Sequence, residues 1–159
     1  MTTDAVHARL LDLCDVVLAE IRLVTLTDGE LFAASFTVDR AFSLDSNNAL
    51  AEKVDAFAAR FGRLQDTTAD KLLPALLKLL GQSSGPVIDN LGYAEKWGWI
   101  ESAQFWMSLR ALRNKIVHEY IKDPVILCDA LNAAHQAVPR LVADANRVVQ
   151  EARTRLPAH

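Results

Sequence analysis

The chain has 159 residues, of which 51% are hydrophobic and 23% are charged, and its formal net charge is −3. This length predicts a single domain over residues 1–159. The apolar fraction excludes intrinsic disorder because it is large enough to form a core. The slightly acidic balance argues against a protein that coats nucleic acid through bulk positive charge, although one or two well-placed cations would suffice for local phosphate chemistry.

Cysteine usage and the N-terminal sequence indicate a cytoplasmic protein. Cys14 and Cys128 are far apart and form neither a disulfide framework nor a Cys-x-x-Cys pair, which is typical of a reducing compartment. The first apolar residues follow acidic rather than basic ones, unlike those of a signal peptide. No run approaches the roughly 20 apolar residues of a membrane span, so no membrane contact is expected.

The first half of the chain predicts two helices separated by a long connection. Apolar residues recur at spacings of three and four from residue 4 to about residue 23, which indicates an amphipathic helix. Residues 25–48 lose this period and contain several turn formers, so we expect a long loop or an insertion there. A second helix is expected from near Ser46 or Asn47, either of which could cap it, to Gly81, with Pro74 marking a kink or a fresh helix start.

The second half predicts three further helices. A short helix is expected over residues 87–100, a longer one from Ser102 to about Ile121, and a last one over residues 123–155, where Pro139 is expected to introduce a kink. No strand-like alternation competes with these patterns for more than a few residues. The predicted fold class is therefore all-α, an antiparallel bundle of four main helices plus a short helix.

The helix from Ser102 to Ile121 carries a polar strip in the stretch "RNKIVHEY", Arg113 to Tyr120. At about 100° per residue, Arg110, Asn114 and His118 lie along one strip with Arg113 at its margin. Arg113 also lies along one edge of the stripe expected to face the core, which consists of Phe105, Leu109, Leu112 and Ile116. We expect a strip of this kind to meet a partner helix or to line a cleft.

A purely structural explanation of the strip is available. His118 would be favoured near the carboxyl end of a helix by the helix dipole. Arg113 could form an ion pair with a carboxylate such as Asp66 or Asp70. The residues alone leave this explanation and a functional one open.

The motif resembles the signature of the HEPN superfamily, and more narrowly that of HepT-type toxins, whose pattern is Arg-Asn-x-x-x-His-x-Tyr. Here the pattern is Arg113-Asn114-Lys115-Ile116-Val117-His118-Glu119-Tyr120. It stands near the end of a late helix, and an Asp-Pro pair follows it. The stretch "RFGRLQDTTADKLLPALLKLLG" also resembles the second helix of this group. The resemblance covers about residues 49–138 and leaves residues 25–48 without a match.

The resemblance implies a dimeric, metal-independent endoribonuclease that acts as the toxin of a type VII-like toxin–antitoxin pair. By this resemblance, Arg113 holds the scissile phosphate of an RNA substrate such as a tRNA, and His118 moves the proton as the 2′-hydroxyl attacks. Asn114 orients the histidine or a phosphate oxygen. The partner implied is a minimal nucleotidyltransferase antitoxin that transfers AMP to Tyr120 and so disables the toxin.

The residue chemistry fits these roles independently of the resemblance. Arginine keeps its charge and presents a planar fork to phosphate oxygens. Histidine exchanges protons near neutral pH. On one helix, Arg113 and His118 are about 140° apart in rotation and about 7.5 Å apart along the axis, so they converge poorly on a single phosphate. A homodimer with a two-fold axis would place the arginine of one chain beside the histidine of the other.

Two alternatives remain from the sequence. The strip could hold a nucleotide's phosphate as the non-catalytic substrate-binding subunit of a two-component nucleotidyltransferase. The chain could also be an inactive helical dimerisation module. RNA cleavage assays distinguish the first hypothesis from these, and titration with ATP identifies the nucleotide-binding alternative.

Other side chains give weaker signals. Arg110 and Arg63 are candidates for further contacts to phosphate or RNA. His7, His135 and His159 lack acid or thiol neighbours at ligand spacing, so neither a metal site nor a cofactor is predicted. Tyr93, Trp97 and Trp99 could stack on bases, although packing is the commoner role of such residues.

Overall fold

The computed structural model describes residues 2–120 and 122–157, and the described residues contain helices and no strand. The predicted all-α class is therefore confirmed. In chain order the helices are α1 (Thr3–Leu31), α2 (Val38–Phe42), the 3₁₀ helix η1 (Ser43–Asp45), α3 (Asn48–Asp66), the π-helical segment η2 (Thr67–Leu72), α4 (Leu73–Leu79), α5 (Val87–Lys96), α6 (Ala103–Glu119) and α7 (Pro124–Thr154).

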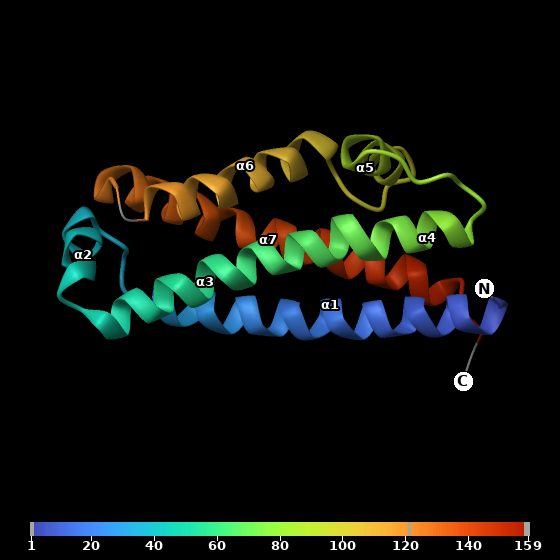
Figure 1. The fold of residues 1–159 in the computed structure, drawn as a ribbon, viewed down its shortest axis with the longest axis horizontal. Helices are drawn as coiled ribbons and strands as arrows, with labels where there is room; N and C mark the ends of the chain where they lie inside the picture. The colour runs from blue at the N-terminus through green and yellow to red at the C-terminus, as the bar shows by residue number, and fades with distance from the viewer. Residues whose placement is uncertain (1, 121, 158–159) are drawn as a thin grey trace.

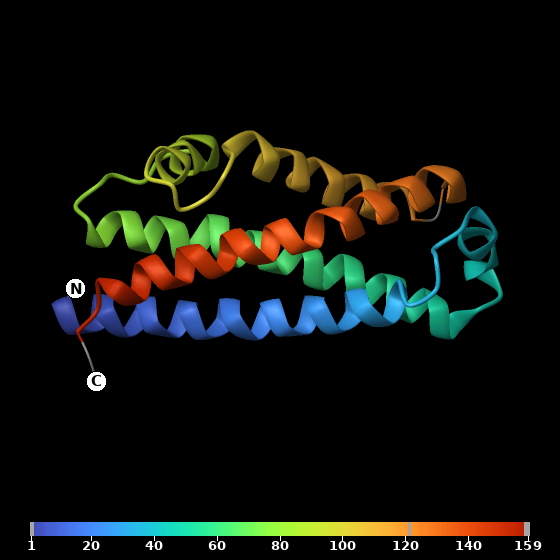
Figure 2. The ribbon, with the colours of Figure 1, turned by 180° about the vertical axis from the view of Figure 1, so that it is seen from behind.

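The long helices run lengthwise beside one another, and successive ones alternate in direction (Figure 1). α3, η2 and α4 follow one another as a single rod that returns alongside α1. Seen from behind, α7 crosses between α1 and α6 (Figure 2). The start of α1 and the end of α7 lie at the same end of the molecule, whereas α2 lies at the opposite end.

α1 is longer than the sequence predicts, and the long loop expected over residues 25–48 is wrong for its first part. The helix continues to Leu31 because Val24 and Leu31 extend its buried stripe and are fully covered. Gly29 lies inside the helix with nothing within 4 Å of a Cβ built on it. Burial of this last turn thus outweighs the turn-forming tendency of the Asp28-Gly29 pair.

The rest of the predicted loop is a short, ordered connection through α2 and η1. Phe36 is buried and packs near Phe32. The guanidinium of Arg40 donates to three backbone carbonyls of the connection, those of Leu31, Ala34 and Ser35. These bonds satisfy carbonyls left free at the end of α1 and fix the path of the chain.

The rod α3–η2–α4 begins and ends where the sequence indicates. The side chain of Asn47 caps α3 by accepting from the N–H of Leu50 at 3.1 Å. Pro74 stands in the first turn of α4, as expected for a fresh helix start. Gly81 ends the rod at φ 75°, and the N–H of Gln82 donates back to the carbonyl of Leu77 at 2.9 Å, the pattern of a glycine-terminated helix.

α6 and α7 start at side-chain caps, Ser102 and Asp123. The predicted end of the first of these helices, Ile121, lies outside the described residues. Pro139 does not end α7, which continues through it to Thr154. Trp106 joins the two helices, because its buried indole N–H donates to Asp144 at 2.8 Å.

Among the described residues, no helix combines the length and the apolar character that crossing a bilayer requires.

Candidate functional site

The arginines of the α6 strip pair with carboxylates of the neighbouring rod. Nη1 of Arg113 donates to Oδ2 of Asp66 at 2.9 Å. Nη1 of Arg110, one turn earlier, donates to Oδ1 of Asp70 at 3.1 Å. Asp66 and Asp70 are the two carboxylates that the sequence offered as ion-pair partners of Arg113. In the structure Asp66 pairs with Arg113, and Asp70 pairs with Arg110. Both pairs are partly exposed, so they fix side-chain positions more than they stabilise the fold.

Arg113 reaches Asp66 because α3 presents a glycine to it. Gly62 is buried, and a Cβ added there would lie 2.9 Å from Nη1 and 3.0 Å from Cγ of Arg113. Those separations are too short for an alanine unless the arginine moves. The aliphatic part of the Arg113 side chain therefore packs directly on the α3 backbone.

The π-helical segment η2 begins between the two acceptor carboxylates. Asp66 immediately precedes it and Asp70 is inside it. Its wider turn changes the angular spacing of these residues relative to an α-helix, and π-helical insertions are frequent at functional sites. Both carboxylates, four residues apart, face α6, one beside each arginine.

His118 is separated from the arginine pairs. Its side chain is 64% exposed, and its Nε2 lies 3.9 Å from the carboxylate of Glu119. Asn114 is also exposed and has no side-chain hydrogen bond to another described residue. One copy of the chain thus presents Arg113 held against α3 and His118 open to solvent.

Tyr120 lies with Arg113 rather than protruding from the helix end. Its hydroxyl donates to the backbone carbonyl of Ala51 at 3.2 Å. Burial, reinforced by the nearby Asp55 carboxylate, raises the pKa of the Tyr120 hydroxyl. Arg113 and Tyr120 line a cavity of about 350 Å³ whose other wall is the small-residue face of α3, Ala58, Ala59 and Gly62.

The arginines of α3 do not join the α6 strip. Arg60 donates to the carbonyl of Leu23 at 3.3 Å and to the hydroxyl of Thr27, both on α1. Arg63 is exposed, and its charge acts on Glu20 of α1. Arg110 and Arg63 are both predicted to contact phosphate or RNA. Arg110 lies beside Arg113 on α6, whereas Arg63 lies on the side of α3 that faces α1.

A histidine–carboxylate pair that sequence reasoning missed joins α1 to α7. Nδ1 of His135 lies 2.7 Å from Oδ1 of Asp28, and its ring stacks on Phe32 with centroids 4.2 Å apart. Asp28 and His135 are distant in sequence, so no local spacing could have indicated the pair. His7 lies on α1, and His159 lies outside the described residues. In the part of the chain that the structure describes, no three histidine, cysteine or acidic side chains gather where they could hold a metal ion.

The aromatic residues before α6 form a connected stack. Tyr93 and Trp97 have centroids 5.6 Å apart, and Trp97 and Trp99 have centroids 4.9 Å apart. Trp99 is buried and Trp97 is half-exposed, so packing accounts for most of this cluster.

Comparisons with known proteins add no relative. No family model matches the chain, and neither a curated protein nor a solved structure matches it.

Proposed function

We propose that the chain is a HEPN-like, metal-independent endoribonuclease that acts as the toxin of a toxin–antitoxin pair in the cytoplasm. The observation that carries the proposal is the arrangement on α6: Arg113 is held by Asp66 and Gly62, while His118, five residues later, is left open to solvent. The antiparallel course of the long helices supports the proposal (Figure 1).

In the proposed reaction the two residues take complementary roles. His118 removes the proton of a ribose 2′-hydroxyl, whose oxygen attacks the adjacent phosphorus, and the bond to the 5′-oxygen of the next nucleotide breaks. The products are a 2′,3′-cyclic phosphate and a 5′-hydroxyl, which receives a proton. The guanidinium of Arg113 stabilises the additional negative charge on the phosphate oxygens. The guanidinium has five N–H donors, and its pair with Asp66 uses only one of its nitrogens. In the proposed site, Asn114 orients the histidine or the phosphate.

A second copy of the chain completes the proposed site. Val117, beside His118 on α6, is a large apolar side chain that is 65% exposed. Packing α6 against α6 of another copy would bury this valine. A two-fold axis there would also bring the arginine of one chain toward the histidine of the other.

The proposed antitoxin is a minimal nucleotidyltransferase that attaches AMP to Tyr120. As a nucleophile the Tyr120 hydroxyl starts from an unfavourable state, because it is bonded to Ala51 and its pKa is raised by burial. The antitoxin must therefore draw the hydroxyl away from α3. The attached AMP would stand in the cavity beside Arg113 and place a phosphate against it.

The deciding experiment is cleavage of cellular RNA by purified protein. His118→Ala is expected to lower the rate by about 10²- to 10⁴-fold, the usual loss on removing a general acid–base. The matched control is His7→Ala on α1, which should keep the parent's rate. Cleavage by His118→Ala at the parent's rate would contradict the proposal. Binding of ATP at the motif without cleavage would favour the nucleotide-binding alternative.

Complementation tests the two-chain site. Arg113→Ala and His118→Ala are each expected to be inactive, and a verified mixed dimer of the two should regain part of the activity because it contains one complete arginine–histidine pair. A monomer by light scattering, or an inactive mixed dimer, would rule out a site shared between copies.

A further inference from the structure

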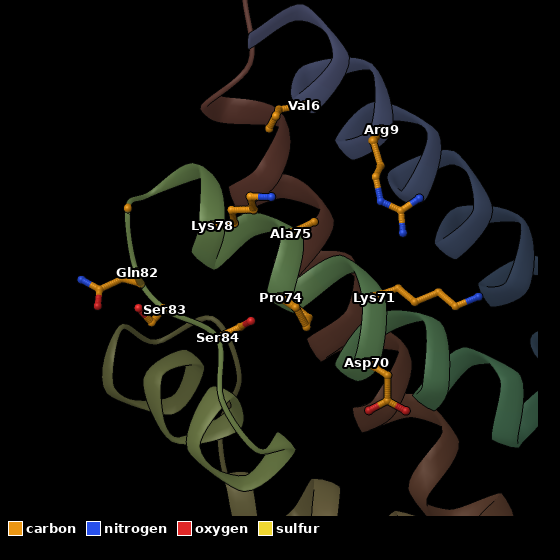
Figure 3. A pocket seen from close by; sticks show the side chains of 11 residues that line it. Val6, Arg9, Asp70, Lys71, Pro74, Ala75, Lys78, Gln82, Ser83 and Ser84 are labelled. Carbon is orange, nitrogen blue, oxygen red and sulfur yellow. The ribbon is translucent and has the colours of Figure 1, made fainter. Parts of the chain in front are cut away.

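A second polar region lies between α1, α4 and the loop that follows α4. It is a pocket of about 620 Å³, within the range of small-molecule sites. Its floor is the face of α4 that carries Pro74 and Ala75, and α1 and the loop form its two sides (Figure 3). We refer to it as the α1/α4 pocket.

Cations gather on the α1 side of the α1/α4 pocket. Arg9 on α1 and Lys71 and Lys78 on the rod extend toward that side (Figure 3). No ion pair within 4 Å joins any of the three to a described carboxylate. The remaining charged group that lines the pocket, Asp70, is paired with Arg110. A chain with a net charge of −3 thus concentrates unpaired positive charge at one cavity.

One buried carboxylate, that of Glu20, lies near Lys71 without forming an ion pair with it. Glu20 on α1 accepts from the hydroxyl of Thr67 at 2.9 Å. Desolvation by burial is the main cause that raises the pKa of Glu20, and the charges of Arg63 and Lys71 oppose it. Arg9 and Lys78 are therefore the cations of this pocket that remain for a ligand.

Neutral polar groups occupy the opposite side, on a loop held at both ends. The loop leaves α4 at the glycine-terminated turn in which Gln82 donates to Leu77. At its other end Asn90, 2% exposed, clamps the backbone of Gly85, accepting from its N–H at 2.9 Å and donating to its carbonyl at 3.1 Å. The side chains of Ser83 and Ser84 are thereby presented to the α1/α4 pocket.

The pocket therefore has a cationic side, an apolar floor and a neutral hydrogen-bonding side. A nucleoside phosphate has the same three parts, namely an anionic phosphate, a flat base and ribose hydroxyls. We propose that the α1/α4 pocket binds a nucleoside phosphate, with the phosphate at Arg9 and Lys78 and the nucleoside over Pro74 and Ala75 toward Ser83 and Ser84. The ligand is either a free mononucleotide or one nucleotide of an RNA strand. This site is separate from Arg113 and His118 and does not depend on the proposed cleavage.

Binding is tested with ¹⁵N-labelled His118→Ala protein, which keeps the pocket and leaves RNA uncleaved under the proposed function. AMP, adenosine and a short oligoadenylate are titrated, and amide shifts are followed along residues 71–84. AMP or the oligoadenylate should shift these amides, and adenosine should bind at least about tenfold more weakly because it lacks the charge-assisted bonds. Binding of AMP alone identifies a mononucleotide site, and binding of the oligoadenylate alone identifies a strand site.

Substitution provides the control. Arg9 and Lys78 are exposed, so Arg9→Ala with Lys78→Ala should leave the fold intact and weaken binding of the phosphate ligand by about tenfold or more. Lys53→Ala, an exposed lysine on α3 away from the pocket, should bind as the parent does. The proposal is overturned if neither phosphate ligand shifts residues 71–84 at millimolar concentration. It is equally overturned if adenosine binds as tightly as AMP, or if the double variant binds as tightly as the parent.

Discussion

The charged side chains around η2 are paired on the face toward α6, whereas, among the described residues, the cations on the face toward α1 are not paired. Toward α6, Asp66 and Asp70 each meet an arginine. Toward α1, Glu20 is buried with one carboxylate oxygen lacking a partner, and Lys71 and Arg9 pair with no described carboxylate. In the part of the chain that the structure describes, the charged groups are thus paired on the α6 face and the cations are unpaired on the α1 face, although Oδ1 of Asp66 and Nε of Arg113 are also buried without a hydrogen-bond partner.

This difference distinguishes side chains that are held in one position from side chains that are available to bind a ligand. A paired arginine gains little stability at a half-exposed site, but it is held in one orientation, as a transition-state contact requires. An unpaired cation is free to meet a ligand's negative charge. Under the two proposals, the α6 face holds its groups in place for catalysis, and the α1 face binds an anion that arrives from solution.

The largest expected effect comes from breaking the α6 face. Under the proposed function, Asp66→Ala should release Arg113 and lower RNA cleavage by about 10- to 100-fold, because Arg113 would lose its alignment with the phosphate. The free energy of unfolding should change by no more than about 1 kcal/mol, since the pair is half-exposed. The rate is measured by single-turnover cleavage and the stability by urea denaturation.

Asp70→Ala is the matched control for this effect, because it frees Arg110 and leaves Arg113 paired. It should cost much less activity than Asp66→Ala. Equal losses from the two variants would show that the Arg113–Asp66 pair has no special positioning role.

A smaller effect is expected from closing the space that α3 leaves for Arg113. Alanine in place of glycine within a helix normally gains up to about 1 kcal/mol of stability. Gly92→Ala in α5, with nothing within 4 Å of the new Cβ, should show that gain. Gly62→Ala should fall below Gly92→Ala by about 1–2 kcal/mol because its Cβ collides with Arg113. Thermal unfolding of both variants provides the measurement, and equal gains would mean that Arg113 moves aside without cost.

The smallest expected effect is a change in pH dependence on the α1 face. Because burial raises the folded-state pKa of Glu20 above its ordinary value of 4.5, the folded protein binds this proton more tightly than the unfolded chain does. Stability from this group is therefore lost as pH rises from the ordinary carboxyl range through the raised pKa. Glu20→Gln should remove that loss and be more stable than the parent near neutral pH, with the gain shrinking toward pH 4.5.

Urea denaturation across this pH range measures the effect. Glu30→Gln, an exposed glutamate on the same helix, is the control and should follow the parent's pH profile. A constant difference between Glu20→Gln and its parent at every pH would mean that the burial of Glu20 does not govern this dependence.

The sequence by itself determined the helical class and most helix ends. Apolar residues at spacings of three and four specify helices directly, and local groups terminate them, such as the Asn47 cap and the turn at Gly81. It also placed Arg110, Asn114 and His118 on one strip of α6, because helical geometry fixes the relative direction of side chains on one element.

Only the tertiary structure decided what those side chains meet. The extension of α1 to Leu31 depends on burial against other helices, which overrides the local turn signal at Gly29. The sequence offered Asp66 and Asp70 as partners of Arg113, but the choice depends on the close approach of α6 to Gly62. The α1/α4 pocket joins residues 9, 71–78 and 81–84, which no local pattern connects. Contacts between elements that are distant in sequence are set by packing, and local sequence patterns do not reveal that packing.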